Sequence, residues 1–194
     1  MLSPGRISFL IVISVLVLLY FLPEKFSKRE YSFDAGDAPK NVAFPLDVEF
    51  PVVVSKFGVK GKTTLREIFE KHPQRTAIVN LWATWCPPCL DELPTLEIFN
   101  RQLEHGSKKM PLLVTISVDE ESVAVEGLYK SLDFAPSMLV LHDKLGVFSK
   151  QVGTTKFPET YWVDAQGKIL HKWLGPQDWV GAGVLATIKK KLPS

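Results

Sequence analysis

The sequence is poor in cysteine and carries almost no charge imbalance. Only two of its 194 residues are cysteine, too few for a disulfide-rich scaffold or a four-cysteine zinc site. The 23 basic and 21 acidic residues leave a net charge of +2, so the basic excess typical of nucleic-acid binding is missing. The chain has no internal repeat, and 46% of it is apolar. These features exclude a disordered or repetitive protein and predict a globular domain.

The longest apolar run lies at the N-terminus, over Ile7 to Leu22, and no charged residue interrupts it. A helix of this length would measure ~24 Å, slightly less than the ~30 Å hydrocarbon core of a bilayer. A cleaved signal peptide is the alternative, but it needs small residues just after the apolar run, and Tyr20 to Phe26 contains none. We therefore expect an uncleaved membrane anchor over residues 1–23, whose flanking charges do not decide its orientation.

The rest of the chain divides into a polar segment and one domain. Residues 24–43 are polar and predict a linker, and residues 44–194 suit one α/β domain. A mixed central sheet with helices on both faces follows from the order of the predicted elements. Apolar patterns predict strands over 50–55, 62–65, 77–82, 112–118, 137–141, 160–163 and 168–174, and helices over 65–71, 87–106, 125–132, 145–151 and 180–192.

The two cysteines, Cys86 and Cys89, enclose Pro87 and Pro88 and lie between a predicted buried strand and a predicted helix. Cys86 would then lie at the N-terminus of the helix, where free N–H groups and the helix dipole favour a thiolate, the nucleophilic form of cysteine. Cys89 follows one helical turn later, close enough to attack a mixed disulfide formed by Cys86. The spacing predicts an exposed attacking thiol at Cys86 and a buried resolving thiol at Cys89.

Three other uses of the cysteine pair stay open. A zinc site would need two further ligands, and the four histidines show no paired spacing. A static structural disulfide would be unusual between prolines at a helix start. A single catalytic cysteine beside a histidine would leave the second cysteine unexplained. We therefore expect a redox-active pair with no metal and no bound cofactor.

The segment Val79 to Pro94, VNLWATWCPPCLDELP, resembles the active-site motif of the thioredoxin superfamily. It is most similar to the membrane-anchored TlpA/ResA/CcmG group of extracytoplasmic thiol–disulfide oxidoreductases. The resemblance covers about residues 45–192, including a hairpin before the first core strand and an inserted helix and strand at 123–141. It implies a thioredoxin-like α/β fold and an enzyme that exchanges disulfides.

The resemblance also implies roles for residues outside the cysteine motif. Pro158 corresponds to the superfamily's cis-proline, so the Phe157–Pro158 bond would be cis and would face Cys86. The backbone of Phe157 would pair with an extended substrate, and Glu159 follows the proline as in the CcmG type. We expect Trp85, Phe157, Pro158 and Glu159 to contact substrate. A proline that merely opens a strand, and a Trp85 that packs in the core, are the plainer alternatives.

One position departs from plain thioredoxins. The strand before the motif carries Asn80 where thioredoxins have a buried, titratable aspartate. The TlpA/ResA group has instead a glutamate three residues after the second cysteine, which is Glu92 in this sequence. A carboxyl buried there would have a raised pKa and would take the proton of Cys89. A Glu92 that lies solvated on the helix surface is the alternative.

These features predict a thiol–disulfide oxidoreductase, most simply a reductase of protein disulfides. The resemblance implies protein substrates such as apocytochrome c and a membrane electron donor of the CcdA/DsbD kind. It also implies a domain on the periplasmic side of the cytoplasmic membrane, where the absence of stray cysteines avoids wrong disulfides. The alternatives are a net oxidant or isomerase, which the Pro-Pro pair does not exclude, and a Cu(I) carrier. Thioredoxin-like copper carriers typically have a wider cysteine spacing and a dedicated histidine, and neither is present.

Overall fold

The computed structural model describes residues 43–55, 61–132 and 137–192. The expected membrane anchor over 1–23 lies outside these ranges, as does the expected linker except for its last residue. Within the described ranges, none of the helices combines the length and the hydropathy needed to cross a bilayer.

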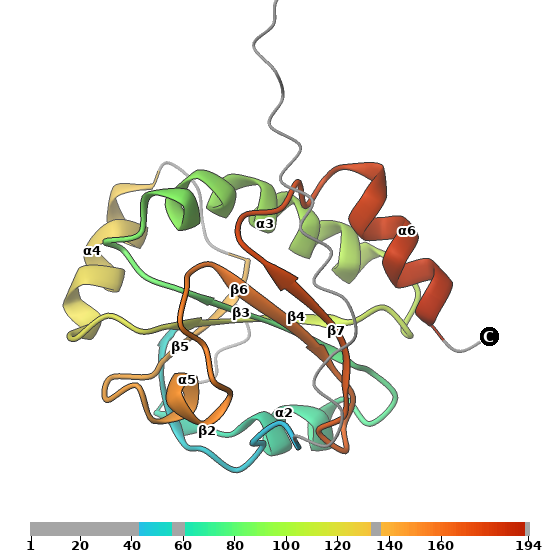
Figure 1. The fold of residues 1–194 in the computed structure, drawn as a ribbon, viewed down its shortest axis with the longest axis horizontal. Coiled ribbons are helices and arrows are strands. Elements are labelled where there is room, and N and C mark those ends of the chain that lie inside the picture. Colours follow the sequence, from blue (N-terminus) through green and yellow to red (C-terminus); the bar gives the residue numbers. More distant parts are fainter. Residues whose placement is uncertain (1–42, 56–60, 133–136, 193–194) are drawn as a thin grey trace, which may run out of the picture. The chain divides into compact units, whose positions relative to one another are not determined.

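In the described part of the chain, seven strands form one mixed sheet in the order β2-β1-β5-β4-β3-β6-β7 (Figure 1). The central strands β5, β4 and β3 are parallel to one another, whereas β1 and β6 run antiparallel to their neighbours. The mixed sheet expected from the sequence is therefore confirmed. The strands are β1 (Phe50–Val54), β2 (Lys62–Thr63), β3 (Ala77–Trp82), β4 (Leu112–Ser117), β5 (Leu139–His142), β6 (Glu159–Val163) and β7 (Ile169–Leu174).

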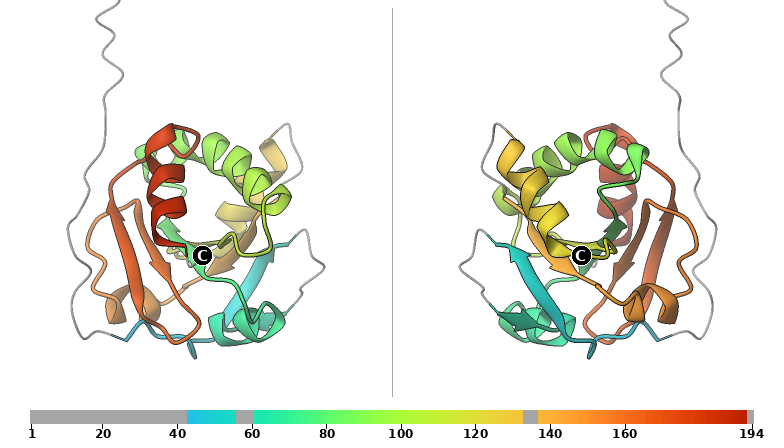
Figure 2. Two further views of the ribbon diagram at one scale, coloured as in Figure 1. Left: turned by 90° about the vertical axis from the view of Figure 1, so that its right-hand side faces the viewer. Right: turned by 90° about the vertical axis from the view of Figure 1, so that its left-hand side faces the viewer.

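Helices cover both faces of this sheet. One face, called the α3 face, carries α3 (Pro87–His105), α4 (Ser122–Ser131) and α6 (Ala182–Lys191). The other, called the α2 face, carries α2 (Leu65–Lys71) and α5 (Val147–Gln151). The views of Figure 1 and Figure 2 agree on this layering.

The central strand β3 shows why both faces need cover. Its side chains alternate, so Ile78 and Trp82 pack into the core of the α3 face, and Val79 and Leu81 into the core of the α2 face. All six residues of β3 are buried, as expected for a strand enclosed on both sides. The C-terminal end of β3 leads directly into α3, so the cysteine motif lies at the C-terminal end of this central strand.

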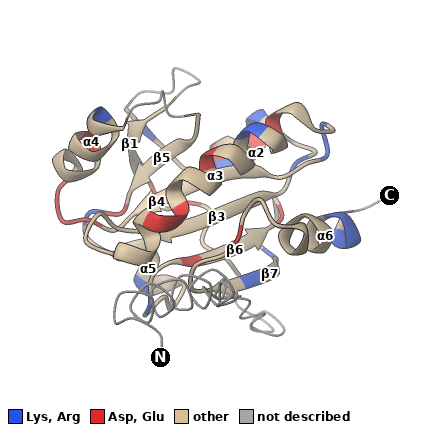
Figure 3. Cartoon of the chain, turned by 90° about the horizontal axis from the view of Figure 1, so that it is seen from above, with Lys and Arg blue, Asp and Glu red and all other residues tan. Residues whose placement is uncertain are grey.

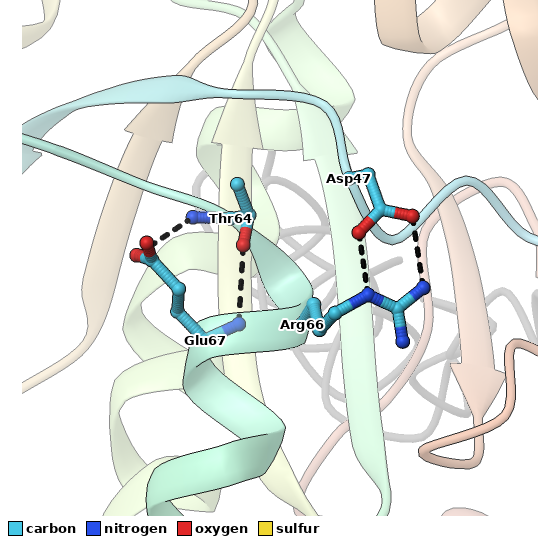
Figure 4. Close-up of polar contacts among 4 residues, drawn as sticks. All are labelled: Asp47, Thr64, Arg66 and Glu67. Carbon is cyan, nitrogen blue, oxygen red and sulfur yellow. Dashed lines mark hydrogen bonds and ion pairs between the residues drawn. The ribbon is translucent and has the colours of Figure 1, made fainter.

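Two helix ends show clear local signals. Thr64 caps α2 in a capping box: its side-chain oxygen accepts a hydrogen bond from the Glu67 amide, and the Glu67 carboxylate accepts one from the Thr64 amide (Figure 4). Arg66 on the same helix donates two hydrogen bonds to Asp47 (Figure 4). The last turn of α6 carries three consecutive lysines, the charge that a helix C-terminus favours (Figure 3).

Two strands have a bound that differs by two residues from the prediction, whereas the bounds of the other strands agree to within one residue. The strand expected over 62–65 ends at Thr63, because Thr64 is already the N-cap of α2. The strand expected over 137–141 begins at Leu139. Ser137 is bound instead by α3, since the Glu97 carboxylate accepts its amide and hydroxyl hydrogens, and Asn100 donates to its carbonyl oxygen.

Candidate active site

The cysteine motif occupies the turn between β3 and α3. Cys86 is the N-cap of α3, and its amide donates to the Ala83 carbonyl oxygen at 3.2 Å. Pro87 and Pro88 follow in the first turn of the helix, where a residue without an N–H costs no helical hydrogen bond. The local sequence therefore places Cys86 at the end of the helix that carries free amide groups, as predicted.

Cys86 and Cys89 form a disulfide with their Cα atoms 5.3 Å apart, so the structure shows the oxidised pair. Cys86 is 5% exposed and Cys89 is fully buried. The prediction of a buried Cys89 is confirmed, whereas the prediction of an exposed Cys86 is wrong for this oxidised pair. The reason is that both cysteines pack into the core of the α3 face.

Trp85, which precedes Cys86 in the sequence, contacts the loop that carries the cis-proline. The indole of Trp85 is 61% exposed, which excludes the core alternative. Its ring packs edge-on against the Phe157 ring, with centroids 5.7 Å apart. The Phe157–Pro158 peptide bond is cis, as the resemblance implied. An aromatic contact between the exposed Trp85 and the partly buried Phe157 therefore joins two segments that are distant in the sequence.

Glu92 lies one helical turn after Cys89 and is 3% exposed, so the solvated alternative is wrong. Its Oε1 accepts a hydrogen bond from Nδ2 of Asn80 at 2.9 Å. Its Oε2 accepts two more, from the indole Nε1 of Trp179 at 2.9 Å and from the amide of Gln177 at 3.1 Å. All three donors are neutral.

Burial is the main influence on the protonation of Glu92. It raises the pKa of this carboxyl to about 7, although the hydrogen bonds from Trp179, Gln177 and Asn80 favour the charged form and act in the opposite direction. A group with a pKa near the working pH can both accept and release a proton. Glu92 therefore suits the proton transfer predicted for it.

Glu159 does not lie beside the dithiol. On β6 the neighbouring Thr160 faces Asn80, whose Nδ2 donates to the threonine hydroxyl at 3.0 Å, so Glu159 points to the α2 face. There its Oε1 lies 2.6 Å from Nζ of Lys172, and its Oε2 accepts a hydrogen bond from the Tyr161 hydroxyl. The side chain is buried and its oxygens are occupied. The expectation that this side chain contacts substrate does not fit the structure.

The sequence analysis did not identify the donors that hold Glu92 from the C-terminal part of the chain. Trp179 is 87 residues away from Glu92 in sequence, and Gln177 is 85 away. The available signal was that a tryptophan followed the last predicted strand, and that a buried indole N–H generally needs an acceptor. No local pattern identifies which acceptor it finds.

The fold and the cysteine pair define a thioredoxin-like protein, and the comparisons with known proteins specify it further. The chain belongs to the Redoxin family, whose model matches residues 53–184. It is 32% identical over 123 residues to the thiol:disulfide interchange protein DsbE homolog of Paracoccus denitrificans, covering 63% of each chain. It is 25% identical over 173 residues to the thiol-disulfide oxidoreductase ResA of Bacillus cereus, covering 89% of this chain and 87% of that one.

A solved structure described as a thiol:disulfide interchange protein DsbE, from Chlorobium tepidum, superposes with a TM-score of 0.61. It covers 78% of this chain and 96% of that chain at 19% sequence identity, a likeness that shows the thioredoxin-like fold. The names of the sequence relatives support the class expected from the motif, a thiol–disulfide oxidoreductase similar to the DsbE and ResA proteins.

Proposed function

We propose that this chain is a thiol–disulfide oxidoreductase that reduces disulfides in other proteins through Cys86 and Cys89. The observation that carries the proposal is a cysteine pair at a helix N-terminus with a buried carboxyl of pKa about 7 one turn further along the helix. A purely structural disulfide needs no such proton acceptor. The names of the Paracoccus and Bacillus relatives, which refer to thiol–disulfide exchange, support the same reaction.

The reaction begins with the reduced pair. The Cys86 thiolate attacks one sulfur of the target disulfide, and the other target sulfur leaves as a thiolate. Cys89 then attacks the Cys86 sulfur of this mixed disulfide and releases the second target sulfur. Two electrons pass to the target, and the chain is left with the Cys86–Cys89 disulfide seen in the structure.

Glu92 supplies the proton acceptor for the second step. Cys89 is fully buried, so water does not take its proton directly. The carboxylate of Glu92 accepts this proton as Cys89 becomes a thiolate and returns it when the pair is reduced again. Asn80, Trp179 and Gln177 hold the carboxylate in place during both steps.

Substrate contact falls to the exposed surface around the pair. Trp85 and Phe157 form an aromatic contact, and the loop containing Pro158 presents the Phe157 backbone to an extended substrate segment. Within this proposal the substrates are proteins with paired cysteines, such as apocytochrome c. A membrane protein of the CcdA/DsbD kind re-reduces the pair, and the domain works on the periplasmic side of the cytoplasmic membrane, attached by residues 1–23.

The reduction potential of the pair tests the direction of the reaction. The purified full-length chain is equilibrated in defined thiol buffers, and the reduced fraction is read from thiol alkylation and from Trp85 fluorescence. A potential near or below ~−250 mV, as in thioredoxin, supports a reductase. A potential near ~−120 mV would make the chain an oxidant and overturn the proposed direction.

The role of Glu92 is tested separately. Glu92→Gln should slow oxidation of the dithiol at neutral pH by about 10². Glu97→Gln is the matched control, because Glu97 is also buried on α3 but binds Ser137 instead of the groups around the cysteines. Equal oxidation rates and equal thiol titrations in wild type and Glu92→Gln would remove Glu92 from the mechanism.

A further inference from the structure

Another buried carboxylate, that of Asp119, holds the turn that leads to Cys86. Asp119 follows β4, and its side chain accepts two kinds of hydrogen bond from Thr84. The Thr84 amide lies 3.0 and 3.2 Å from the two carboxylate oxygens, and the Thr84 hydroxyl donates to Oδ1 at 2.5 Å. Thr84 precedes Cys86 by two residues, so this contact fixes the backbone just before the cysteine.

Asp119 is itself fixed to the sheet. Ser117, the last residue of β4, donates its hydroxyl to Oδ2 of Asp119 at 2.6 Å and accepts the Asp119 amide at 3.1 Å. His142, the last residue of β5, donates from Nε2 to the Asp119 carbonyl oxygen at 2.8 Å. The position of Thr84 is therefore set by two central strands.

Backbone hydrogen bonds also hold this turn, since the Cys86 carbonyl oxygen accepts the amides of Cys89 at 3.0 Å and Leu90 at 3.2 Å. Cys86 is the N-cap of α3 but forms no side-chain capping hydrogen bond. Its amide hydrogen bond to Ala83 is long, at 3.2 Å. A cap in most helices is a Ser, Thr, Asp or Asn that binds the helix itself. Here the cap is the reacting residue, and Thr84 with Asp119 supplies the restraint from outside the helix.

We propose that Asp119 is a positioning residue for thiol–disulfide exchange: through Thr84 it fixes where the Cys86 sulfur lies at the N-terminus of α3. The inference rests on the proposed function, because it concerns the geometry of that same reaction. It adds a carboxylate with a role different from that of Glu92: Glu92 moves a proton, and Asp119 holds a turn. A displacement of ~1 Å at a reacting group can cost ~10² in rate.

Two substitutions in the full-length chain test this role. Thr84→Val removes the hydroxyl but keeps the amide and the charge of Asp119. Asp119→Asn keeps the shape but turns an NH₂ group toward donors. Both should slow the reduction of insulin in the presence of dithiothreitol by about tenfold. Thr84→Ser, which retains the hydroxyl, should recover most of the rate lost in Thr84→Val.

Asp143→Asn is the matched control. Asp143 is also a buried aspartate that follows a central strand, but its carboxylate accepts the amides of Phe148 and Ser149 at the start of α5, on the α2 face. Asp143→Asn disturbs hydrogen bonds comparable to those disturbed by Asp119→Asn, so the two variants should lose a comparable amount of stability. We expect the exchange rate of Asp143→Asn to stay at the wild-type value.

The thiol pKa of Cys86 is measured from the pH dependence of its alkylation. It distinguishes an effect on the position of the Cys86 sulfur from a direct effect of the charge on Asp119. Placement predicts that Thr84→Val raises this pKa, because the sulfur is less well aligned with the helix N-terminus. The proposal is overturned if Thr84→Val matches wild type while Asp119→Asn alone changes the pKa, or if Asp143→Asn slows exchange equally. A wild-type chain that reduces no insulin would contradict the proposed function instead, and the alkylation series would still test the placement of Cys86.

Discussion

Two buried glutamates on opposite faces of the same sheet have opposite surroundings. Glu92, on the α3 face, is held by three neutral N–H groups, whereas Glu159, on the α2 face, contacts the ammonium group of Lys172 at 2.6 Å. Burial raises the pKa of Glu92 to about 7. Burial is the largest single influence on Lys172 and would lower its pKa, but the hydrogen bonds and charge attraction of Glu159 and Tyr161 together outweigh it, so this pKa is raised.

The difference is that neutral donors surround one buried carboxyl, whereas an ammonium group lies against the other. Neutral donors orient a carboxylate without fully offsetting its loss of water, so its charge stays easy to remove. A partly buried ammonium group at 2.6 Å instead supplies an opposite charge, without which the carboxylate would be buried unpaired. The α3 face thus holds a carboxyl with a raised pKa one helical turn from Cys89, and the α2 face holds an ion pair with little exposed surface.

Removing the cation should have the largest effect. Lys172→Met leaves Glu159 buried without a cation and should lower the free energy of unfolding by about 3–5 kcal/mol at neutral pH. Denaturant unfolding of the oxidised chain measures this. Lys62→Met is the control, because it breaks an ion pair with Glu49 whose side chains are both more than half exposed, and it should cost about 1 kcal/mol or less. Similar losses of unfolding free energy in Lys172→Met and Lys62→Met would show that the Lys172–Glu159 pair contributes no more than an exposed ion pair.

The pH dependence of stability should reveal Glu92. Between its unfolded pKa of 4.5 and its folded pKa of about 7, the native chain keeps a proton that the unfolded chain has lost. Stability of the wild type relative to Glu92→Gln should therefore fall as the pH rises through this window, by on the order of 3 kcal/mol in total. Denaturant titrations of the oxidised proteins from about pH 4 to about pH 8 measure the difference. Parallel curves would mean that Glu92 titrates like a solvated glutamate.

The groups that donate hydrogen bonds to the Glu92 carboxylate should affect its pKa, and with it the pH range over which stability falls. Trp179→Phe keeps an aromatic ring next to Phe99 and Trp173 but removes one hydrogen bond to the charged carboxylate. The pKa of Glu92 should rise further, by up to about one unit, which is readable as a shifted midpoint in the same titration. Trp162→Phe, which removes a hydrogen bond to the Thr76 hydroxyl on the same face, should leave the midpoint in place.

The helix cap on the α2 face should give the smallest effect. Thr64→Ala removes the capping box of α2 and should cost about 1 kcal/mol in unfolding free energy. The exchange rate and the pH midpoint of Glu92 should not change, because the cap lies across the sheet from the dithiol. A shifted midpoint would mean that the two faces are coupled more tightly than their separate cores suggest.

Local patterns in the sequence predicted most elements because their causes are local. The predicted strand over 77–82 and the predicted helix over 65–71 match β3 and α2 in both bounds. The start of β5 was misplaced because Ser137 is bound by Glu97 and Asn100 of α3, which no pattern around residue 137 indicates.

The candidate site also has one part that the local sequence predicts and another that depends on contacts between distant segments. The chemistry of Cys86 and Cys89 follows from their spacing and from the strand and helix that flank them. The burial of Glu92 depends on Trp179 and Gln177, which only the folded chain brings near it. Side chains alternate along β6, so the face that Glu159 occupies follows once the face of Thr160 is known. The sequence alone does not show which face Thr160 occupies.

The distance in sequence between Glu92 and Trp179 has a consequence for the order of events during synthesis. The ribosome adds Asn80, both cysteines and Glu92 long before Trp179, which lies 87 residues after Glu92. Until then Glu92 lacks its indole donor. Under the proposed mechanism, the nascent chain therefore carries a dithiol whose proton acceptor lacks one of its hydrogen-bond donors, and full redox activity requires the last segment of the fold.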